Sequence, residues 1–179
     1  EHYSIYNLIK HDNHSDIEQV ILTASGGPFL NKPIKTINNA KPHLALKHPN
    51  WKMGKKISID SATLMNKLFE VIEAKNIFNI DYKKIFVLIH PDSYVHAIIK
   101  FKNGLTKILI HDTSMKIPIF NAIYFNDNNK KIFSNEIDLK KLNNLNLIKP
   151  DMQKFSALKI LKLLPNKSSL FETILISTN

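Results

Sequence analysis

Hydroxyl, amide, ammonium and carboxylate side chains follow one another along one predicted helix. Lys56–Asp60 alternates like a short strand, and the apolar spacing after it predicts a helix over Ser61–Phe78 whose first residue is a natural N-cap. Glu70 lies four residues after Asn66 and three after Lys67, so the three side chains would share one side of the helix. A helix N-terminus attracts anions. The pattern predicts an anion site beside a carboxylate, although spacing alone favours a capped helix with an ordinary Lys–Glu surface pair.

A second polar group follows Gln19–Thr23, whose β-branched residues predict a buried strand. The strand ends in Ser25-Gly26-Gly27, where backbone N–H groups and a hydroxyl could hold a phosphate. Taken alone, a glycine pair after a strand is more often only a turn. The helix described above makes a ligand site at this turn more credible, because α/β folds place ligands at the ends of strands.

Histidines form a third group. His48 lies in a predicted loop, and His90 and His96 lie on either side of a turn between two predicted strands. A lone histidine usually has a structural role, but three beside a phosphate-type site favour ligand contact, because imidazole donates to oxyanions and carries protons near neutral pH. His11 and His14 have no neighbouring partner ligand, so we interpret them as surface residues and not as metal ligands.

The remaining patterns predict the elements that would position these groups. Lys84–His90 is typical of a strand, and Asn103-Gly104 predicts a hairpin turn between strands over Val95–Lys102 and Leu105–His111. A helix is expected over about Pro118–Phe125, with the proline in its first turn. Together these elements predict an α/β (α+β) fold in which helices flank a mixed sheet with an antiparallel hairpin.

Changes in composition predict three parts of the chain. The polar groups fall in a first domain over residues 1–125. Residues 126–150 are polar and irregular, which is typical of a linker, with one strand near Leu145–Ile148. Residues 151–179 are expected to begin a C-terminal helical domain.

Two helices are expected in this last part. They cover Phe155–Leu164 and Ser169–Ile176. The second would open with a capping box between Ser169 and Glu172.

Composition excludes several classes of function. The chain of 179 residues has no cysteine, which excludes disulfides, thiol nucleophiles and thiolate metal sites. Its net charge of +10 comes from lysine alone, without arginine, and the lysines are scattered along the chain. That distribution argues against a nucleic-acid-binding module and indicates compositional drift in an AT-rich genome. No apolar stretch is long enough for a membrane span. The start at Glu1, without methionine or a signal-peptide pattern, indicates a cut within a longer sequence.

Three long motifs resemble the 1-deoxy-D-xylulose 5-phosphate reductoisomerase family. They are Leu22–Phe29, His48–Lys67, and Leu88–Pro91 together with Ser93 and His96. The match runs in order, with matching spacings, from Glu1 to about Leu164. The resemblance implies conversion of 1-deoxy-D-xylulose 5-phosphate to 2-C-methyl-D-erythritol 4-phosphate, with NADPH and a divalent cation, Mg²⁺ or Mn²⁺, in non-mevalonate isoprenoid synthesis. It also implies a homodimer in the bacterial cytoplasm or a plastid-like organelle, and a catalytic domain over residues 1–125.

The resemblance also implies roles for individual residues. The residues expected to hold the substrate are Ser25, His48, Ser61, Asn66, Lys67 and Glu70. The expected metal ligands are Glu1 and Glu70, which suit a hard cation. Glu1 matches the last residue of the family's Asp-Ser-Glu motif, whose first two residues would precede it.

The expected catalytic residues are Glu1, Glu70, His96 and Trp51. Trp51 would close over the substrate as part of a flexible lid. Met53, Ser93 and Met115 match positions near the cofactor ring.

The chain departs from the family's pattern in three ways. It contains no Gly-x-Gly-x-x-Gly and no N-terminal NADPH-binding domain, so this chain alone is expected to bind NADPH poorly. Ala24 replaces a common glycine. Leu68 replaces the glycine that usually follows Asn-Lys, and we expect it to crowd the packing near Lys67. These departures leave open a second reading, a remnant that keeps the fold without turnover.

Overall fold

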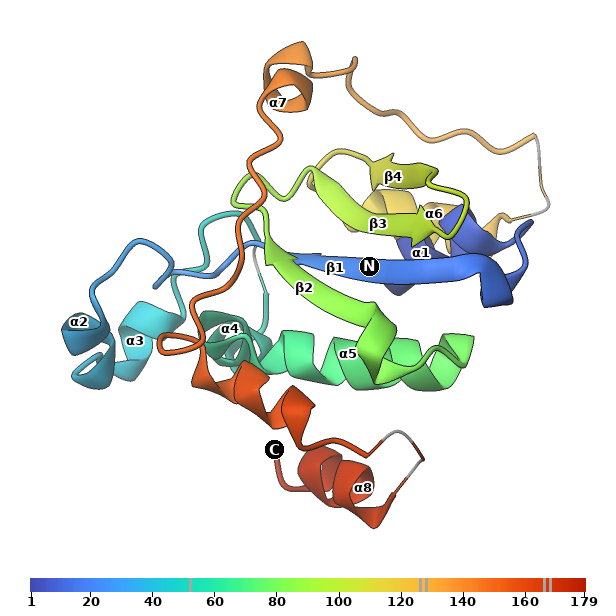
Figure 1. Cartoon of the computed structure of the whole chain (residues 1–179). Coiled ribbons are helices and arrows are strands. Elements are labelled where there is room, and N and C mark those ends of the chain that lie inside the picture. Colours follow the sequence, from blue (N-terminus) through green and yellow to red (C-terminus); the bar gives the residue numbers. More distant parts are fainter. Residues whose placement is uncertain (52, 126, 128, 166, 168) are drawn as a thin grey trace.

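A four-stranded mixed sheet forms the centre of the computed structural model, which describes all residues except 52, 126, 128, 166 and 168 (Figure 1). The strands are β1 (Ile17–Ala24), β2 (Ile85–Ile89), β3 (Val95–Phe101) and β4 (Thr106–Ile110), in the spatial order β2-β1-β3-β4. β1 pairs in parallel with β2, whereas β1 with β3 and β3 with β4 are antiparallel. The sheet confirms the predicted fold class, the strands predicted over Gln19–Thr23 and Lys84–His90, and the hairpin.

The turns that carry polar residues lie together at one end of the strands of this sheet. Because β1 and β2 are parallel, their last residues, Ala24 and Ile89, lie side by side. The next backbone N–H, that of His90, donates to the Ala24 carbonyl at 2.7 Å. β3 runs back from the same edge and begins at Val95. The turns after β1 and β2 and the start of β3 therefore meet, as expected for a ligand site in an α/β sheet.

Two helices share the main core with the sheet. α1 (His2–Ile9) packs against β3 and β4, and α5 (Met65–Phe78) packs against β1 and β2. Their buried residues form one cluster with those of the strands; its members include Ile5, Ile9, Val20, Leu22, Leu68, Val71, Ile72, Ala97 and Ile99. α6 (Lys116–Ile123) lies next to α1 and confirms the helix predicted around Pro118. Burial of this apolar surface holds α1 and α5, and the residues at their starts, against the sheet.

The segment before α5 differs from the prediction of a strand followed by one long helix. Lys55–Thr63 forms a helix, α4, so the strand over Lys56–Asp60 is wrong. Leu64 then adopts the left-handed conformation, with φ 59°, and α5 begins at Met65. Ser61 lies in the last turn of α4 and is not an N-cap.

The cause of this error is visible in the burial of α4. Ile57 and Ile59 are exposed, whereas Ser58 and Asp60 are buried, which is the reverse of a half-buried strand. The Ser58 hydroxyl donates to the carbonyl four residues earlier, and Lys56 forms an i,i+4 ion pair of 2.7 Å with Asp60. These local helical contacts outweigh the alternating pattern.

Shorter helical turns connect the main elements. They are η1 (His14–Asp16), α2 (Ile34–Asn38), α3 (Pro42–Ala45) and η2 (Tyr82–Lys84). The region around Trp51 is a loop, as predicted. Among the helices in the described part of the chain, none has the length and apolar character to cross a membrane.

The C-terminal third has little regular structure before its last helices. α7 is Leu139–Asn143, and the strand predicted near Leu145–Ile148 reduces to one antiparallel bridge between Ile148 and Ile89. The two predicted helices are present as η3 (Ser156–Lys162), a 3-10 helix, and α8 (Leu170–Ser177). Residues 126–150 therefore contain one short helix and one bridge in their described part.

The predicted capping box of α8 is wrong. Ser169 makes no side-chain capping bond in the described structure. Glu172 is instead 5% exposed and accepts hydrogen bonds from Tyr82 (2.6 Å) and Lys75 (3.1 Å). These bonds outweigh the opposing effect of burial and lower the pKa of Glu172. A buried ionic cluster thus joins α8 to α5.

Candidate functional site

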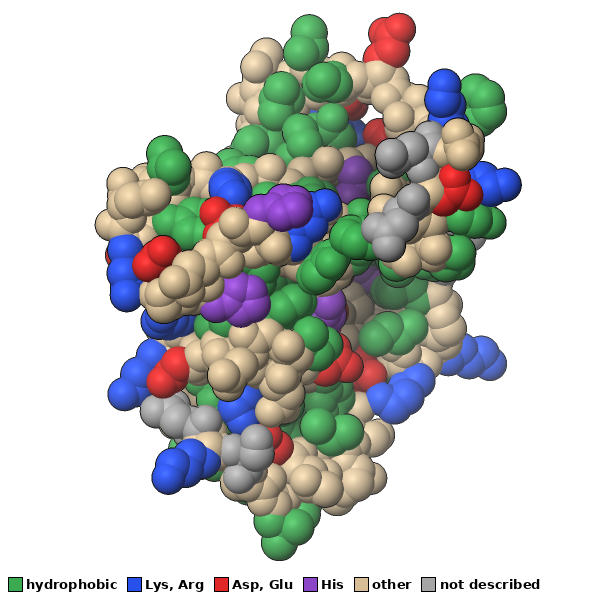
Figure 2. Space-filling view, turned by 90° about the vertical axis from the view of Figure 1, so that its right-hand side faces the viewer, with side chains coloured by type: hydrophobic (Ala, Val, Ile, Leu, Met, Phe, Trp, Pro, Cys, Tyr) green, Lys and Arg blue, Asp and Glu red, His purple; other side chains and the backbone are tan. Residues whose placement is uncertain are grey.

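A cavity of about 370 Å³ opens at the edge of the sheet where these turns meet. The twelve residues to which the family resemblance assigns a role all line it: Glu1, Ser25, His48, Trp51, Met53, Ser61, Asn66, Lys67, Glu70, Ser93, His96 and Met115. On the face drawn in Figure 2, histidine and acidic side chains lie close together among hydrophobic ones. Residues that are distant in sequence therefore converge on one cavity.

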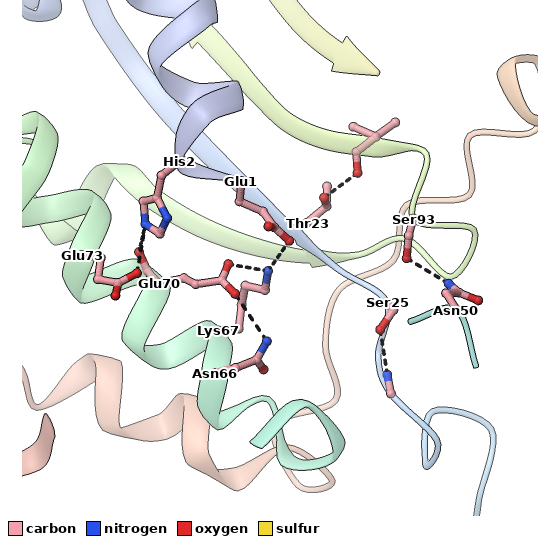
Figure 3. Close-up of polar contacts among 12 residues, drawn as sticks. Glu1, His2, Thr23, Ser25, Asn50, Asn66, Lys67, Glu70, Glu73 and Ser93 are labelled. Carbon is pink, nitrogen blue, oxygen red and sulfur yellow. Dashed lines mark hydrogen bonds and ion pairs between the residues drawn. The ribbon is translucent and has the colours of Figure 1, made fainter. Parts of the chain in front are cut away.

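Three acidic and basic groups form the centre of one wall (Figure 3). The Lys67 Nζ lies 2.8 Å from Glu1 Oε1 and 2.6 Å from Glu70 Oε2. The Asn66 side-chain N–H donates to the other Glu70 oxygen at 3.3 Å. Lys67 is only 2% exposed, so the surface-pair interpretation of its spacing with Glu70 is wrong. Its ammonium is instead the shared counter-charge of two carboxylates.

Burial and charge shift the pKa values of this group in different directions. Burial raises the pKa of Glu70 to about 7, and the neighbouring Glu1 charge adds to this. For Glu1, burial acts in the same direction, but the Lys67 ammonium and the terminal amino group of Glu1 together outweigh it and lower the pKa to about 2. The two carboxylates hold the pKa of Lys67 above its usual value although burial opposes this. One carboxylate is therefore firmly ionised, and the other can exchange a proton near neutral pH.

Leu68, the neighbour of Lys67, does not crowd this group. Its side chain is fully buried in the main core cluster, and Lys67 keeps both ionic contacts. The expectation of crowding is therefore wrong.

The serine and glycine turn forms the opposite wall. The Ser25 hydroxyl accepts the Gly27 backbone N–H at 3.2 Å and lies 2.9 Å from His48 Nε2. Gly27 has φ +65°, and a Cβ there would lie 2.8 Å from the backbone oxygen of Ser61. Glycine thus allows the turn to touch the end of α4, which places the Ser25 and Ser61 hydroxyls at the same cavity.

The ring of His48 organises the loop that covers this wall. Its Nδ1 accepts the backbone N–H groups of Asn50 (3.1 Å) and Trp51 (3.0 Å). Burial lowers the pKa of His48, so the ring is neutral at pH 7 and carries its proton on Nε2. That proton is donated to the Ser25 hydroxyl. The arrangement directs Trp51 and Met53 to the cavity.

His96, whose ring stacks on that of His111, forms the third side. The rings of His96 and His111 lie 3.5 Å apart between centroids, at 11°. His96 Nε2 donates to the His111 carbonyl at 3.1 Å, so the unprotonated Nδ1 of the neutral ring is an acceptor. Burial and the neighbouring His111 lower the pKa of His96 to about 4. His96 is thus a neutral base or hydrogen-bond acceptor at physiological pH.

Several residues that line the cavity were not predicted from the sequence to do so. They are Thr23, Ala24, Ile57, Leu64 and Val95. Thr23 has a clear role, because its hydroxyl donates to the Val95 carbonyl at 2.6 Å and joins β1 to the start of β3. The only available signal was its place at the end of a predicted strand. His90, which was expected near the ligand, is fully buried and contacts the Asn146 carbonyl at 3.0 Å.

The carboxylates suit a hard divalent cation in number and type. Within the described residues, no group of three or more His, Asp or Glu side chains could hold a metal ion. Glu1 and Glu70 nevertheless lie close together, because both contact the Lys67 Nζ, and Mg²⁺ is commonly held by one or two carboxylates with substrate oxygens and water completing its shell. The residues present therefore fit such an ion.

This fold and site define a class: an α/β domain whose cavity places hydroxyls and imidazoles opposite a paired-carboxylate group. Comparison with known proteins identifies the relatives within that class. Residues 1–78 match the family model of the 1-deoxy-D-xylulose 5-phosphate reductoisomerase C-terminal domain. The resemblance inferred from the sequence is confirmed, because the chain is similar over its whole length to part of these reductoisomerases.

Individual relatives show how much of the family the chain spans. The reductoisomerase of Pelagibacter ubique is 58% identical over 179 residues, which are all of this chain and 46% of that relative. The enzyme of a Sulfurihydrogenibium species is 43% identical over 98% of this chain and 46% of its own length. The chain thus spans about half the length of the curated relatives it matches.

Solved structures agree with this assignment. A reductoisomerase in complex with NADPH, fosmidomycin and magnesium is 39% identical, with a TM-score of 0.77 over 90% of this chain and 42% of that one. The enzyme from Zymomonas mobilis in complex with NADPH is 32% identical, with a TM-score of 0.79 over 90% and 41% of the two chains. The α/β architecture is therefore shared with these enzymes.

Proposed function

We propose that this chain is the catalytic core of a 1-deoxy-D-xylulose 5-phosphate reductoisomerase. The observation that carries the proposal is the single cavity lined by all twelve residues that match the family's functional positions. The reaction would convert the ketose phosphate to 2-C-methyl-D-erythritol 4-phosphate within isoprenoid synthesis.

The substrate phosphate would bind between the two hydroxyl-bearing elements. Ser25 and Ser61 come together through the close approach at Gly27, and the neutral His48 already donates to Ser25. The Asn66 side-chain oxygen is buried without a partner in the described structure, so it can accept from a substrate hydroxyl. Lys67 adds positive charge at the same cavity. Preformed donors of this kind position a substrate without reorganisation.

Glu1 and Glu70 would hold the divalent cation, Mg²⁺ or Mn²⁺. When bound, the cation supplies Lewis-acid stabilisation of the developing charge on substrate oxygens. The ammonium of Lys67 helps to keep the Glu1 carboxylate ionised, which is the form that binds a cation. Glu70, whose pKa without the cation is about 7, would release its proton when it binds the cation.

The remaining lining residues would shape the environment of hydride transfer from NADPH. Trp51 and Met53 would exclude water above the substrate, while Ser93 and Met115 would lie beside the cofactor ring. His96, neutral and with an unprotonated Nδ1, would accept a hydrogen bond from the substrate or receive its proton.

The wider assignments follow the same proposal. The catalytic domain would cover residues 1–125, the linker 126–150, and the start of the helical domain 151–179. The protein would work as a cytoplasmic homodimer that requires an NADPH-binding domain outside this chain. The lysines are scattered along the sequence, and this distribution does not support the nucleic-acid-binding alternative.

The test uses the full-length protein that contains this chain. NADPH oxidation is followed on 1-deoxy-D-xylulose 5-phosphate with Mn²⁺ or Mg²⁺, for the natural protein and a Glu70→Gln variant. The matched control is Glu73→Gln, one turn further along α5, whose side chain is 55% exposed. We expect metal-dependent turnover that falls at least 100-fold in Glu70→Gln and stays within twofold in Glu73→Gln.

Two results would overturn the proposal. A folded full-length protein without turnover would establish the non-catalytic remnant. Equal turnover in Glu70→Gln and the natural protein would remove Glu70 from the reaction.

A further inference from the structure

The loop that carries Trp51 contacts two neighbouring turns beside the cavity through different residues. On one side, His48 contacts the Ser25 hydroxyl at 2.9 Å. On the other, Asn50 reaches the turn between β2 and β3, more than forty residues away in sequence (Figure 3). The loop therefore bridges these two neighbouring turns, and Asn50 makes the side-chain contacts to the second one.

The contacts of Asn50 are short and have a defined polarity. Its Nδ2 donates to the Pro91 carbonyl at 2.6 Å and to the Ser93 hydroxyl at 2.9 Å. A carbonyl can only accept, so the Pro91 contact fixes which end of the amide faces the turn. When the amide nitrogen is replaced by oxygen, the bond to the Pro91 carbonyl is lost, and a contact with Ser93 requires the hydroxyl to turn and donate.

The acceptor Ser93 is itself held in place. It has φ +50°, it is buried, and its backbone N–H donates to the His90 carbonyl at 3.0 Å. Thr113 donates to its carbonyl oxygen at 3.3 Å. Because the Ser93 hydroxyl accepts from Asn50, its own hydrogen remains available to an acceptor in the cavity that it lines. Asn50 thus contacts a rigid partner and also sets the direction of that hydroxyl.

From this geometry we infer that Asn50 is a positioning residue, which fixes the Trp51 loop to the β2–β3 turn and orients the Ser93 hydroxyl toward the cavity. The role in catalysis rests on the proposed function, but the role in fixing the loop does not. Two readouts separate these claims.

The first readout is the fluorescence of Trp51, the only tryptophan of the chain. Asn50→Asp keeps the shape of the side chain, removes both donors and places a carboxylate against the Pro91 carbonyl. We expect acrylamide quenching of Trp51 to increase at least twofold, with an unchanged melting curve by circular dichroism. The matched control is Asn39→Asp, whose side chain donates only to its own helix at Lys35. Unchanged quenching in a folded Asn50→Asp protein would overturn the inference.

The second readout is steady-state kinetics of the full-length protein. We expect Asn50→Asp to lower kcat about 10-fold or more and to change KM by a smaller factor. The reason is that the residues proposed to bind the phosphate, such as Ser25 and Ser61, stay in place. A normal kcat with increased quenching would refute the orientation of Ser93 while leaving the loop attachment supported. An inactive natural protein would refute the proposed function. The fluorescence result would then still decide whether Asn50 attaches the Trp51 loop to the β2–β3 turn.

Discussion

Leu68 provides a sharp test of how this chain differs from its family. The family resemblance implies glycine at this position, and restoring glycine would seem a natural way to improve the site. The structure predicts the opposite. Leu68 is 0% exposed and packs in the main core among residues of α1, α5, β1 and β3. Leu68→Gly should therefore destabilise the fold without any benefit to Lys67.

The size of the loss follows from two contributions. Truncation of a fully buried leucine to alanine costs about 2–5 kcal/mol, because apolar contacts are lost and a cavity remains. Glycine in a helix interior costs about 1 kcal/mol more than alanine. We expect about 2–5 kcal/mol for Leu68→Ala and about 3–6 kcal/mol for Leu68→Gly. That is a large part of the 5–15 kcal/mol that is typical of a folded domain.

Urea denaturation followed by circular dichroism measures this difference. With an m-value of about 2 kcal/mol per molar, a loss of 4 kcal/mol lowers the midpoint by about 2 M. The matched control is Leu105→Ala at an exposed hairpin position, where a change within about 0.5 kcal/mol is expected. If Leu68→Gly is as stable as the natural chain, or if it raises turnover of the full-length protein, the packing argument is refuted.

Three further predictions concern other parts of the fold. Glu172→Gln removes one charge of a buried ion pair and should lower the free energy of unfolding by about 3–5 kcal/mol; an unchanged urea midpoint would contradict this. Burial and a neighbouring imidazole lower the pKa of His96 to about 4, so the folded state binds fewer protons than the unfolded state between pH 6.5 and 4. The free energy of unfolding should therefore be highest above pH 6.5 and fall by up to about 3 kcal/mol toward pH 4. His96→Gln should flatten this pH dependence in denaturation curves, whereas His14→Gln should not. Gly104→Ala should lower the free energy of unfolding by about 1–2 kcal/mol, because Gly104 has a positive φ. Gly27→Ala should lower it clearly more, because a Cβ at Gly27 would also lie 2.8 Å from a backbone atom. Equal melting temperatures of the two variants would argue against a tight contact at Gly27.

The sequence predicted the strands and the hairpin because their signals are local. Gln19–Thr23 carries β-branched residues in one run, and Asn103-Gly104 defines its turn by itself. The site residues were found because long family motifs contain them. By contrast, Lys56–Asp60 has the alternation of a strand but forms a helix, because its serine, lysine and aspartate make helical contacts and its isoleucines face outward.

Contacts between distant segments were not predictable from local pattern. Asn50 reaches the β2–β3 turn, and nothing in its neighbourhood indicates that partner. Glu172 has the spacing of a capping box with Ser169, yet it turns inward to Lys75 and Tyr82. In both cases the tertiary arrangement decides between alternatives that the sequence permits equally.

The break between α4 and α5 explains why the site exists at all. In one continuous helix, Ser61 and Asn66 would lie about 140° apart around the axis, because each residue advances about 100°. The two side chains could not then face one cavity. Left-handed Leu64 ends α4 and begins α5, and both side chains line the same cavity. A single buried residue with φ 59° thereby brings the hydroxyl of one helix to the amide and ammonium of the next. The polar cluster depends on this interruption of the helix that the periodicity predicts.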